Sequence, residues 1–179
     1  GSSFKKVYYD DVKMRAVSKF VPAEDIVIPY TATDLESCER ITHVVKMMGN
    51  ELRKKQIGGM YRDVDISPSS VDTNDAEDKY NELDGLTETQ NAEDIVLLEF
   101  HCDLDIPGFE DKNVTTGEPT GIKLPYVVTV DEGTNKVLSI YRNYKQGDPL
   151  RKKIQYFVHY KFLPGLGFYG FGLIHMLGG

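Results

Sequence analysis

Histidine and aspartate residues alternate near the middle of the sequence, and both residue types bind metal ions. His101, Asp103 and Asp105 occupy every second position, with Cys102 between the first two. In a β-strand the three would lie on one face, where imidazole and carboxylate groups suit several metals. A strand with one solvent-exposed polar face produces the same alternation. We therefore interpret the pattern as an exposed strand face, predict no metal site, and keep these three residues as the candidates for the alternative.

Two groups of three consecutive basic residues could contact phosphate groups: Arg53, Lys54 and Lys55, and Arg151, Lys152 and Lys153. The whole sequence contains 21 Lys and Arg residues against 28 Asp and Glu residues, which gives a net charge of −7. A domain that holds nucleic acid by its charge is expected to be basic. We therefore interpret both groups as solvent-exposed charged surface and keep contacts with phosphates or a partner as the alternative.

The stretch from residue 165 to residue 172 has the glycine spacing of a dinucleotide-binding motif, GxGxxG. Such a site requires the motif between a strand and a helix, with an acidic residue roughly 20 positions further on. No acidic residue follows this motif, and bulky aromatic residues stand between its glycines. We predict instead a tight turn that presents Phe168, Tyr169 and Phe171 as anchors for packing or for a partner.

The other residue types that often carry chemistry form no recognisable active site. The sequence has no Gly-x-Ser-x-Gly motif, and neither cysteine has the local context of a Cys–His nucleophile. We interpret His43, His159 and His175 as packed or surface residues, and Cys38 and Cys102 as buried, reduced thiols. The sequence therefore predicts no catalytic residue, no cofactor and no enzymatic activity.

The elements that would position these residues are mostly β-strands. The composition, with 40% hydrophobic and 27% charged residues among 179, is that of a globular protein with room for one domain. Consecutive strands with short connections usually pair as a meander, so we predict an α+β fold dominated by antiparallel strands and hairpins. Runs rich in β-branched and aromatic residues predict strands over residues 7–9, 16–21, 25–29, 41–47, 95–104, 126–130, 137–141 and 154–162.

Shorter signals predict turns and helices. A glycine-containing link over residues 131–136 joins two strand runs, which is typical of a hairpin. Asn50 can cap the helix formers after it and Gly58 can end them, so a helix is expected from about Asn50 to Ile57. Thr33, followed by acidic residues, suits a short helical turn. In the last predicted strand, alternate residues would share one face: Ile154, Tyr156, Val158, Tyr160 and Phe162.

The negative charge is concentrated between residues 63 and 94. This window holds eleven acidic residues and one basic residue, a net charge of −10. Residues 67–94 include few large apolar residues. They cannot bury enough apolar surface to offset the conformational entropy that the chain loses on folding. We therefore divide the chain into a tag remnant, a strand and helix region, an acidic mobile loop or linker, and an antiparallel region of the same domain, truncated at the start of a following helix. Their bounds are residues 1–3, 4–66, 67–94 and 95–179.

Three blocks of the sequence, in this order, carry a resemblance to a known family. The first reads FVPAEDIVIPY at residues 20–30, ATDLE at 32–36 and RITH at 40–43. The second reads NELRK at 50–54 and YRDV at 61–64. The third reads HCDLD at 101–105, TGIKLPY at 120–126 and KFLPGLGFYG at 161–170. Together the blocks resemble the portal proteins of short-tailed bacteriophages, and the likeness spans residues 7–179.

The resemblance implies a structural role in a virion. The chain would be an internal fragment, from the wing region, of a subunit that forms a ring of about twelve copies at a capsid vertex. Double-stranded DNA passes through such a ring without sequence-specific binding. Capsid and scaffold proteins, the terminase, and tail or head-completion proteins dock on it, in the virion or in the host cytoplasm during assembly, with no membrane. Two alternatives remain: a β-rich interaction module of another virion or host protein, and a small metal-dependent hydrolase.

Overall fold

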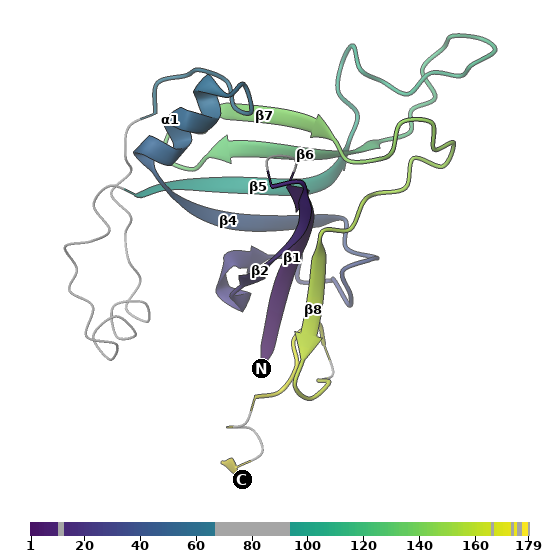
Figure 1. Cartoon of the computed structure of the whole chain (residues 1–179). Helices are drawn as coiled ribbons and strands as arrows, with labels where there is room; N and C mark the ends of the chain where they lie inside the picture. Colours follow the sequence, from purple (N-terminus) through teal and green to yellow (C-terminus); the bar gives the residue numbers. More distant parts are fainter. Residues whose placement is uncertain (11–12, 67–93, 166, 173, 175–176, 179) are drawn as a thin grey trace. The chain divides into compact units, whose positions relative to one another are not determined.

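The computed structural model describes residues 1–10, 13–66, 94–165, 167–172, 174 and 177–178. Its strands form two mostly antiparallel sheets, so the predicted β-rich α+β class is confirmed. The predicted acidic loop, residues 67–94, lies outside the described residues except at residue 94, where a strand begins. In Figure 1 the elements are β1 (Ser2–Asp10), β2 (Arg15–Val21), a 3₁₀-helix (Ala23–Asp25), β3 (Ile26–Val27), β4 (Arg40–Met48), α1 (Gly49–Ile57), β5 (Asp94–Leu104), β6 (Leu124–Asp131), β7 (Val137–Arg142) and β8 (Phe157–Lys161).

A three-stranded sheet with the order β2-β1-β8 joins strands from both ends of the sequence. β1 pairs antiparallel with β2, which places Phe4 opposite Val21, and antiparallel with β8, which places Phe4 opposite His159. Both predicted N-terminal strands are confirmed. Ser2 and Ser3, predicted to belong to a tag remnant, form part of β1. The meander prediction is wrong for β8, which pairs with β1 instead of with the strand before it.

A five-stranded sheet follows the sequence order β3-β4-β5-β6-β7, so the predicted meander is confirmed there. β6 and β7 run in opposite directions (Figure 1) and are joined by the predicted turn. The Asp131 backbone N–H donates to the Lys136 carbonyl at 2.9 Å, and the Asp131 carboxylate accepts hydrogen bonds from the backbone and hydroxyl of Thr134. Asn135 takes a left-handed φ of 55°, which asparagine tolerates better than most residues.

Helix α1 forms where the sequence predicts it, but its start differs from the expected one. The N-cap is Met48, which has no side-chain capping bond, and Asn50 lies inside the first turn. At the other end, Gly58 donates its N–H to a helix carbonyl at 2.9 Å, and Gly59 takes a φ of 74°. Glycine adopts this left-handed conformation without a Cβ clash. Among the described residues, no helix is long and apolar enough to span a membrane.

Two local predictions between β2 and β4 need correction. The strand predicted over residues 25–29 covers only the two residues of β3, which pair with β4. The helical turn expected after Thr33 does not form. Instead the Asp34 carboxylate accepts a hydrogen bond from the Ser37 backbone N–H at 2.7 Å, which holds the pKa of Asp34 below its ordinary value. A short polar side chain that captures a nearby amide in this way favours a turn over a helix.

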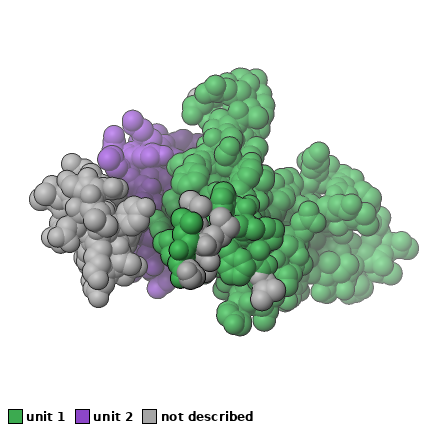
Figure 2. All heavy atoms as spheres, turned by 90° about the horizontal axis from the view of Figure 1, so that it is seen from below, with its two compact units in different colours: residues 1–43, 100–127, 142–179 green, residues 44–99, 128–141 purple. Residues whose placement is uncertain are grey.

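The chain divides into two compact units (Figure 2), and each has its own hydrophobic core. Unit 1 comprises residues 1–43, 100–127 and 142–179, and unit 2 comprises residues 44–99 and 128–141. Each core is therefore built from segments that lie far apart in the sequence. The buried side chains of the unit 1 core are Phe4, Val21, Ile26, Leu35, Cys38, Ile41, Phe157 and Phe168. Those of the unit 2 core are Met47, Leu52, Ile95, Leu97 and Leu138.

The face of β8 that holds the alternating apolar residues Val158 and Tyr160 is the exposed one. Phe157 is 2% exposed and belongs to the unit 1 core. His159 stacks on Phe4, with the ring centroids 4.4 Å apart. Val158 and Tyr160, on the other face, are 43% and 47% exposed. The pairing with β1 sets this orientation, because it places His159 opposite the buried Phe4.

Candidate functional site

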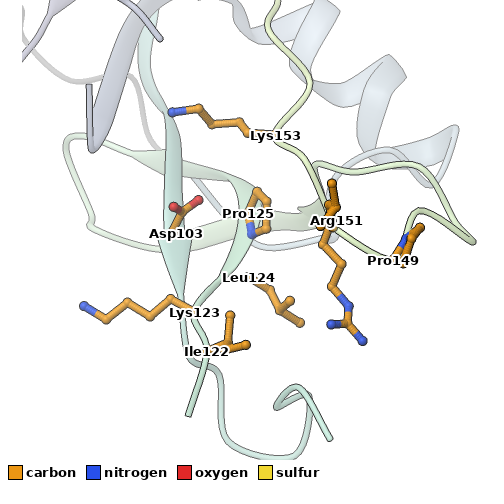
Figure 3. A pocket seen from close by; sticks show the side chains of 9 residues that line it. Asp103, Ile122, Lys123, Leu124, Pro125, Pro149, Arg151 and Lys153 are labelled. Atoms are coloured by element: carbon orange, nitrogen blue, oxygen red, sulfur yellow. The ribbon is translucent and has the colours of Figure 1, made fainter. Parts of the chain in front are cut away.

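A pocket of about 350 Å³ in unit 1 brings together three parts of the chain (Figure 3). It lies where β5 ends, where β6 begins and along residues 149–153. The lining of the pocket contains three cationic side chains, one carboxylate, aliphatic side chains and prolines. Of the predicted basic group Arg151, Lys152 and Lys153, only Lys152 does not line the pocket, and its side chain is exposed. The lining residues are Asp103, Ile122, Lys123, Leu124, Pro125, Pro149, Leu150, Arg151 and Lys153.

One carboxylate fixes the backbone beside the pocket. The Asp148 side chain accepts hydrogen bonds from the backbone N–H groups of Lys152 and Leu150, both at 3.0 Å. These bonds hold the pKa of Asp148 below its ordinary value. Arg151, between the two donors, has a φ of 46°, a left-handed conformation that costs a non-glycine residue energy. The turn at Asp148 therefore sets the direction in which the Arg151 side chain leaves the backbone.

Arg151 is held by a buried carboxylate of its own unit. Its Nη2 lies 2.6 Å from Oδ1 of Asp111, whose side chain is 4% exposed. The other carboxylate oxygen of Asp111 accepts a hydrogen bond from the Thr120 hydroxyl at 2.7 Å. Both oxygens of Asp111 are thus engaged, and the charge of Arg151 is neutralised. The pair fastens the connection between β5 and β6 to residues 149–153, so that Arg151 supports a wall of the pocket.

The two lysines of the pocket are held differently from Arg151. Lys153 Nζ donates a hydrogen bond to the Cys38 carbonyl at 2.9 Å, which leaves two of its ammonium protons for another acceptor. Lys123 is exposed and makes no hydrogen bond or ion pair with another described residue. In Figure 3 both lysine side chains extend to one side, with Asp103 between them, and Arg151 points the other way. Lys123 and Lys153 are therefore the cations of the pocket that form no ion pair with a described residue, and the Asp103 carboxylate lies between them.

The first basic group lies on α1 in unit 2. Arg53 forms an ion pair with Asp63, and Lys55 forms one with Glu51 at 3.5 Å, one helical turn away. Lys54 is exposed. Surface pairs of this kind typically contribute roughly 0 to 1 kcal/mol. The group thus has the character of charged surface that the sequence predicts, and a contact with phosphates or a partner stays a prediction.

The three metal candidates are not brought together as ligands. His101 is 3% exposed, and its ring packs edge to face against Tyr156 and Phe157, with centroid distances of 5.6 Å and 5.1 Å. Asp103 and Asp105 are exposed. The prediction of an exposed face is therefore wrong for His101, which aromatic side chains cover. Within the described part of the chain, no group of three or more His, Cys, Asp or Glu side chains could hold a metal ion.

Both cysteines and two of the remaining histidines, His43 and His159, are at least partly buried within the fold. Cys38 and Cys102 are both free thiols, the first buried as predicted and the second half-buried. Burial raises the pKa of both, which keeps the thiols protonated and weakly nucleophilic. His43 is 7% exposed and His159 is half-buried, so both are packed. His175 lies outside the described residues.

Across the glycine-rich stretch the chain reverses direction, since Leu163 and Phe171 form an antiparallel bridge, and its aromatic residues divide between core and surface. Phe168 is 5% exposed and belongs to the unit 1 core, whereas Tyr169 and Phe171 are 47% and 42% exposed. A Cβ at Gly165 or Gly170 would come within 2.6 Å of a backbone oxygen. These glycines are therefore explained by close backbone approach within the chain. Of the three predicted anchors, Phe168 serves internal packing.

Sequence reasoning missed several residues that build the pocket. Lys123 is a single base between apolar residues, and no pattern around it indicates a site. Asp111 has the sequence context of an ordinary surface carboxylate, and its ion pair with Arg151 joins distant parts of the chain. A usable signal existed at Asp148, because an aspartate followed by proline favours a turn. The pocket itself depends on tertiary structure.

Comparison with known protein families found no family model that matches the chain, and comparison with curated proteins found no similar one. The functional argument therefore depends on the sequence blocks and on the geometry. The geometry consists of two compact units, a pocket lined by Lys123, Arg151, Lys153 and Asp103, and aromatic residues exposed at a glycine-rich turn.

We predict that Asp111→Asn lowers the free energy of unfolding by about 1 to 3 kcal/mol. The substitution keeps the size of the side chain but removes the charge that neutralises Arg151 and one of the two acceptor oxygens. Urea denaturation followed by circular dichroism measures the loss. Asp105→Asn, at an exposed aspartate, is the matched control and should change stability by less than about 0.5 kcal/mol. Equal losses in the two variants would show that the buried pair contributes nothing specific.

We predict that the fold loses stability as the pH falls from about 7 to about 5, in part because of His159. Burial, and then the nearby Lys161, hold the pKa of His159 below its ordinary value. The unfolded chain binds the proton near the ordinary pKa of about 6.5. In this window the unfolded chain thus binds more protons than the folded chain, and the free energy of unfolding decreases. His159→Phe keeps a stacked ring and should flatten the slope measured by urea denaturation at several pH values; an unchanged slope contradicts the prediction.

Proposed function

We propose that the chain is a structural part of a tailed-phage portal protein, the ring at a capsid vertex through which DNA is packaged and ejected. In this role the complete protein contacts other portal subunits, capsid and scaffold proteins, the terminase, and tail or head-completion proteins. DNA passes without sequence-specific binding. The observation that carries the proposal is the resemblance of three sequence blocks, in the same order, to that family.

The positions of the blocks in the fold support the proposal. The first block supplies Val21, Ile26 and Ile41 to the unit 1 core, and the third supplies Phe168 to the same core. The second block supplies Leu52 to the unit 2 core. A likeness confined to exposed loops would say little about the scaffold. Here the resembling residues are among those whose packing holds each unit together.

An interaction module of another virion or host protein is the second candidate, because one face of the three-stranded sheet carries exposed aromatic side chains. Phe20 on β2 and Tyr160 on β8 are 62% and 47% exposed. Their β1 partners, Lys5 and Ser3, lie on the face opposite Phe4, and Lys5 Nζ is 5.4 Å from the centroid of the Tyr160 ring. Exposed aromatic side chains on a sheet are typical of protein contact surfaces.

The two candidates differ in how the complete protein that contains this chain assembles. A portal protein should form ring-shaped particles with a central channel in negative-stain electron microscopy. This chain alone should be monomeric or weakly associated in light scattering, because the ring contacts require neighbouring regions. A complete protein that stays monomeric, or a reading frame without long helices after this region, contradicts the portal proposal and favours the interaction module. A stable ring formed by this chain alone contradicts the prediction of weak association.

A further inference from the structure

We propose that the outer edge of β2 binds an extended segment of a partner protein as an added antiparallel strand. The segment would alternate apolar residues with acidic residues. β2 is an end strand of the three-stranded sheet, next to β1 and on the side away from β8 (Figure 1). The proposal is independent of the portal assignment, because it rests on the backbone and the side chains of β2 and of its neighbour β1.

The hydrogen bonds of β1 show which backbone groups of β2 face away from the sheet. The Val7 N–H donates to the Tyr156 carbonyl at 2.7 Å, and the Phe162 N–H donates to the Gly1 carbonyl at 3.1 Å. Since these polar groups alternate in direction along a strand, the odd-numbered residues of β1 bond towards β8 and the even-numbered ones towards β2. Even-numbered residues of β1 lie opposite odd-numbered residues of β2. The residues of β2 whose N–H and C=O groups point outward are therefore Ala16, Ser18 and Phe20.

This edge is open within the part of the chain that the structure describes. Ala16, Ser18 and Phe20 are exposed, and their outward backbone groups have no hydrogen-bond partner among the described residues. The end strands of the five-stranded sheet are protected, because β3 has only two residues and the Leu138 carbonyl of β7 accepts the Arg62 N–H at 2.8 Å. An exposed strand with unpaired backbone groups is a template for one more strand.

The side chains beside the edge provide an apolar surface for the added strand. Ala16 lies opposite Tyr9, and Ser18 lies opposite Val7. Tyr9, Val7 and Phe20 are 57%, 39% and 62% exposed. Ala16 and Ser18 are small, so a long apolar side chain on a strand about 4.8 Å away can extend over them towards β1. Partner residues whose backbone bonds to β2 would share this face and should therefore be apolar.

The remaining residues of the added strand would lie beside a positively charged face. Lys19 is exposed, forms no ion pair with a described residue, and lies opposite Lys6 in the strand pair. Residues 1–21 contain five basic and two acidic residues, a net charge of +3 in a chain whose net charge is −7. An acidic residue next to Lys19 would form a favourable cross-strand pair. These alternate positions of the partner should therefore be acidic.

The same charge disfavours a second copy of this chain as the occupant. Two copies paired through β2 would bring the Lys19 side chains of both to one shared edge. Lysines on an edge strand are a common means by which proteins avoid pairing with their own copies. An acidic partner strand gains from the charge that a second copy would have to overcome.

Fluorescence anisotropy with a short labelled peptide of alternating valine and glutamate tests the proposal. We expect saturable binding that weakens with added salt. Methyl groups on the valine amide nitrogens should abolish binding, because these N–H groups would bond to β2. Methyl groups on the glutamate amide nitrogens should change the affinity by less than about twofold, since these N–H groups would point away from β2.

Two variants of β2 test the charge and the backbone separately. Lys19→Glu should weaken binding by at least about threefold, and a peptide with lysine in place of glutamate should bind this variant more tightly than the unmodified chain. Ser18→Pro removes an outward N–H that has no partner among the described residues, so it should fold and should weaken binding by about tenfold. Circular dichroism verifies the fold of both variants.

The matched control for Lys19→Glu is Lys123→Glu, at an exposed lysine outside the three-stranded sheet. It makes the same change of net charge and should leave peptide binding unchanged. The proposal is overturned if the valine–glutamate peptide does not bind, if both sets of methylated amides weaken binding equally, or if both lysine variants do so. A dimer in light scattering that Ser18→Pro disrupts would make a second copy the occupant of the edge and would likewise overturn it.

Discussion

Replacing Phe4 by alanine should lower the free energy of unfolding by about 3 to 5 kcal/mol, the range for truncating a large buried aromatic side chain. Phe4 is 0% exposed and lies on β1, the middle strand of the three-stranded sheet. Its ring stacks on His159 at 4.4 Å and lies 6.0 Å from the ring of Phe168. Alanine would leave a cavity where β1, β8 and the glycine-rich turn meet. Since domains are typically stable by about 5 to 15 kcal/mol, this one change removes a large part of the total.

The matched control for Phe4→Ala is Phe20→Ala on the neighbouring strand β2. Phe20 is 62% exposed, so the same atoms are removed without leaving an internal cavity, and the loss should stay below about 1 kcal/mol. Urea denaturation of both variants gives the two free energies, and equal slopes against urea would show that the unfolded states are comparable. If the two substitutions cost the same, Phe4 does not occupy the centre of the core described above.

Local sequence patterns were sufficient for most of the elements, because those elements depend on local chemistry. The helix over Gly49–Ile57 follows from good helix formers that end in glycines. The β6–β7 hairpin follows from two β-rich runs around a short glycine-containing link. The cap at Asn50 was wrong because several start points satisfy the same pattern, and helix ends are set by one or two hydrogen bonds. For α1, the sequence therefore predicted that a helix forms, but it did not predict the residue at which the helix begins.

The pairing of β1 with β8 and the buried face of β8 could not be predicted from local pattern. β8 has apolar or aromatic side chains on both faces: Phe157 and His159 on one, Val158 and Tyr160 on the other. Alternation therefore does not indicate which face is buried. The choice follows from Phe4, which faces His159 across the strand pair. His101 was expected to be exposed and is buried, because the aromatic rings that cover it come from a distant segment.

The candidate pocket also could not be predicted from local sequence patterns. The basic group at residues 151–153 was visible in the sequence, but its three members have different roles in the fold. Arg151 is bound to Asp111, Lys153 lines the pocket, and Lys152 points to solvent. Another residue of the pocket, Lys123, lies in the connection just before β6. Charge patterning indicates where cations are concentrated, whereas ion pairing across the fold decides which of them can bind a ligand.

Replacing Leu97 by alanine should lower the free energy of unfolding by about 2 to 5 kcal/mol. Leu97 is 0% exposed and lies on β5, the central strand of the five-stranded sheet. It belongs to the unit 2 core together with Leu52 of α1 and Leu138 of β7. The cavity would therefore weaken both the sheet and the packing of the helix. A helix of nine residues is marginal by itself in water, so α1 depends on this packing for its stability.

This dependence gives the Leu97→Ala prediction a second, local readout. Amide hydrogen exchange in α1 should become faster than in the unmodified chain, because the helix loses part of the surface that it packs on. The matched control is Leu150→Ala at a side chain that is 73% exposed; it should change stability by less than about 0.5 kcal/mol and leave exchange in α1 unchanged. If Leu97→Ala lowers global stability but exchange in α1 keeps its original rate, the helix does not depend on this core. If neither quantity changes, Leu97 is not a core residue.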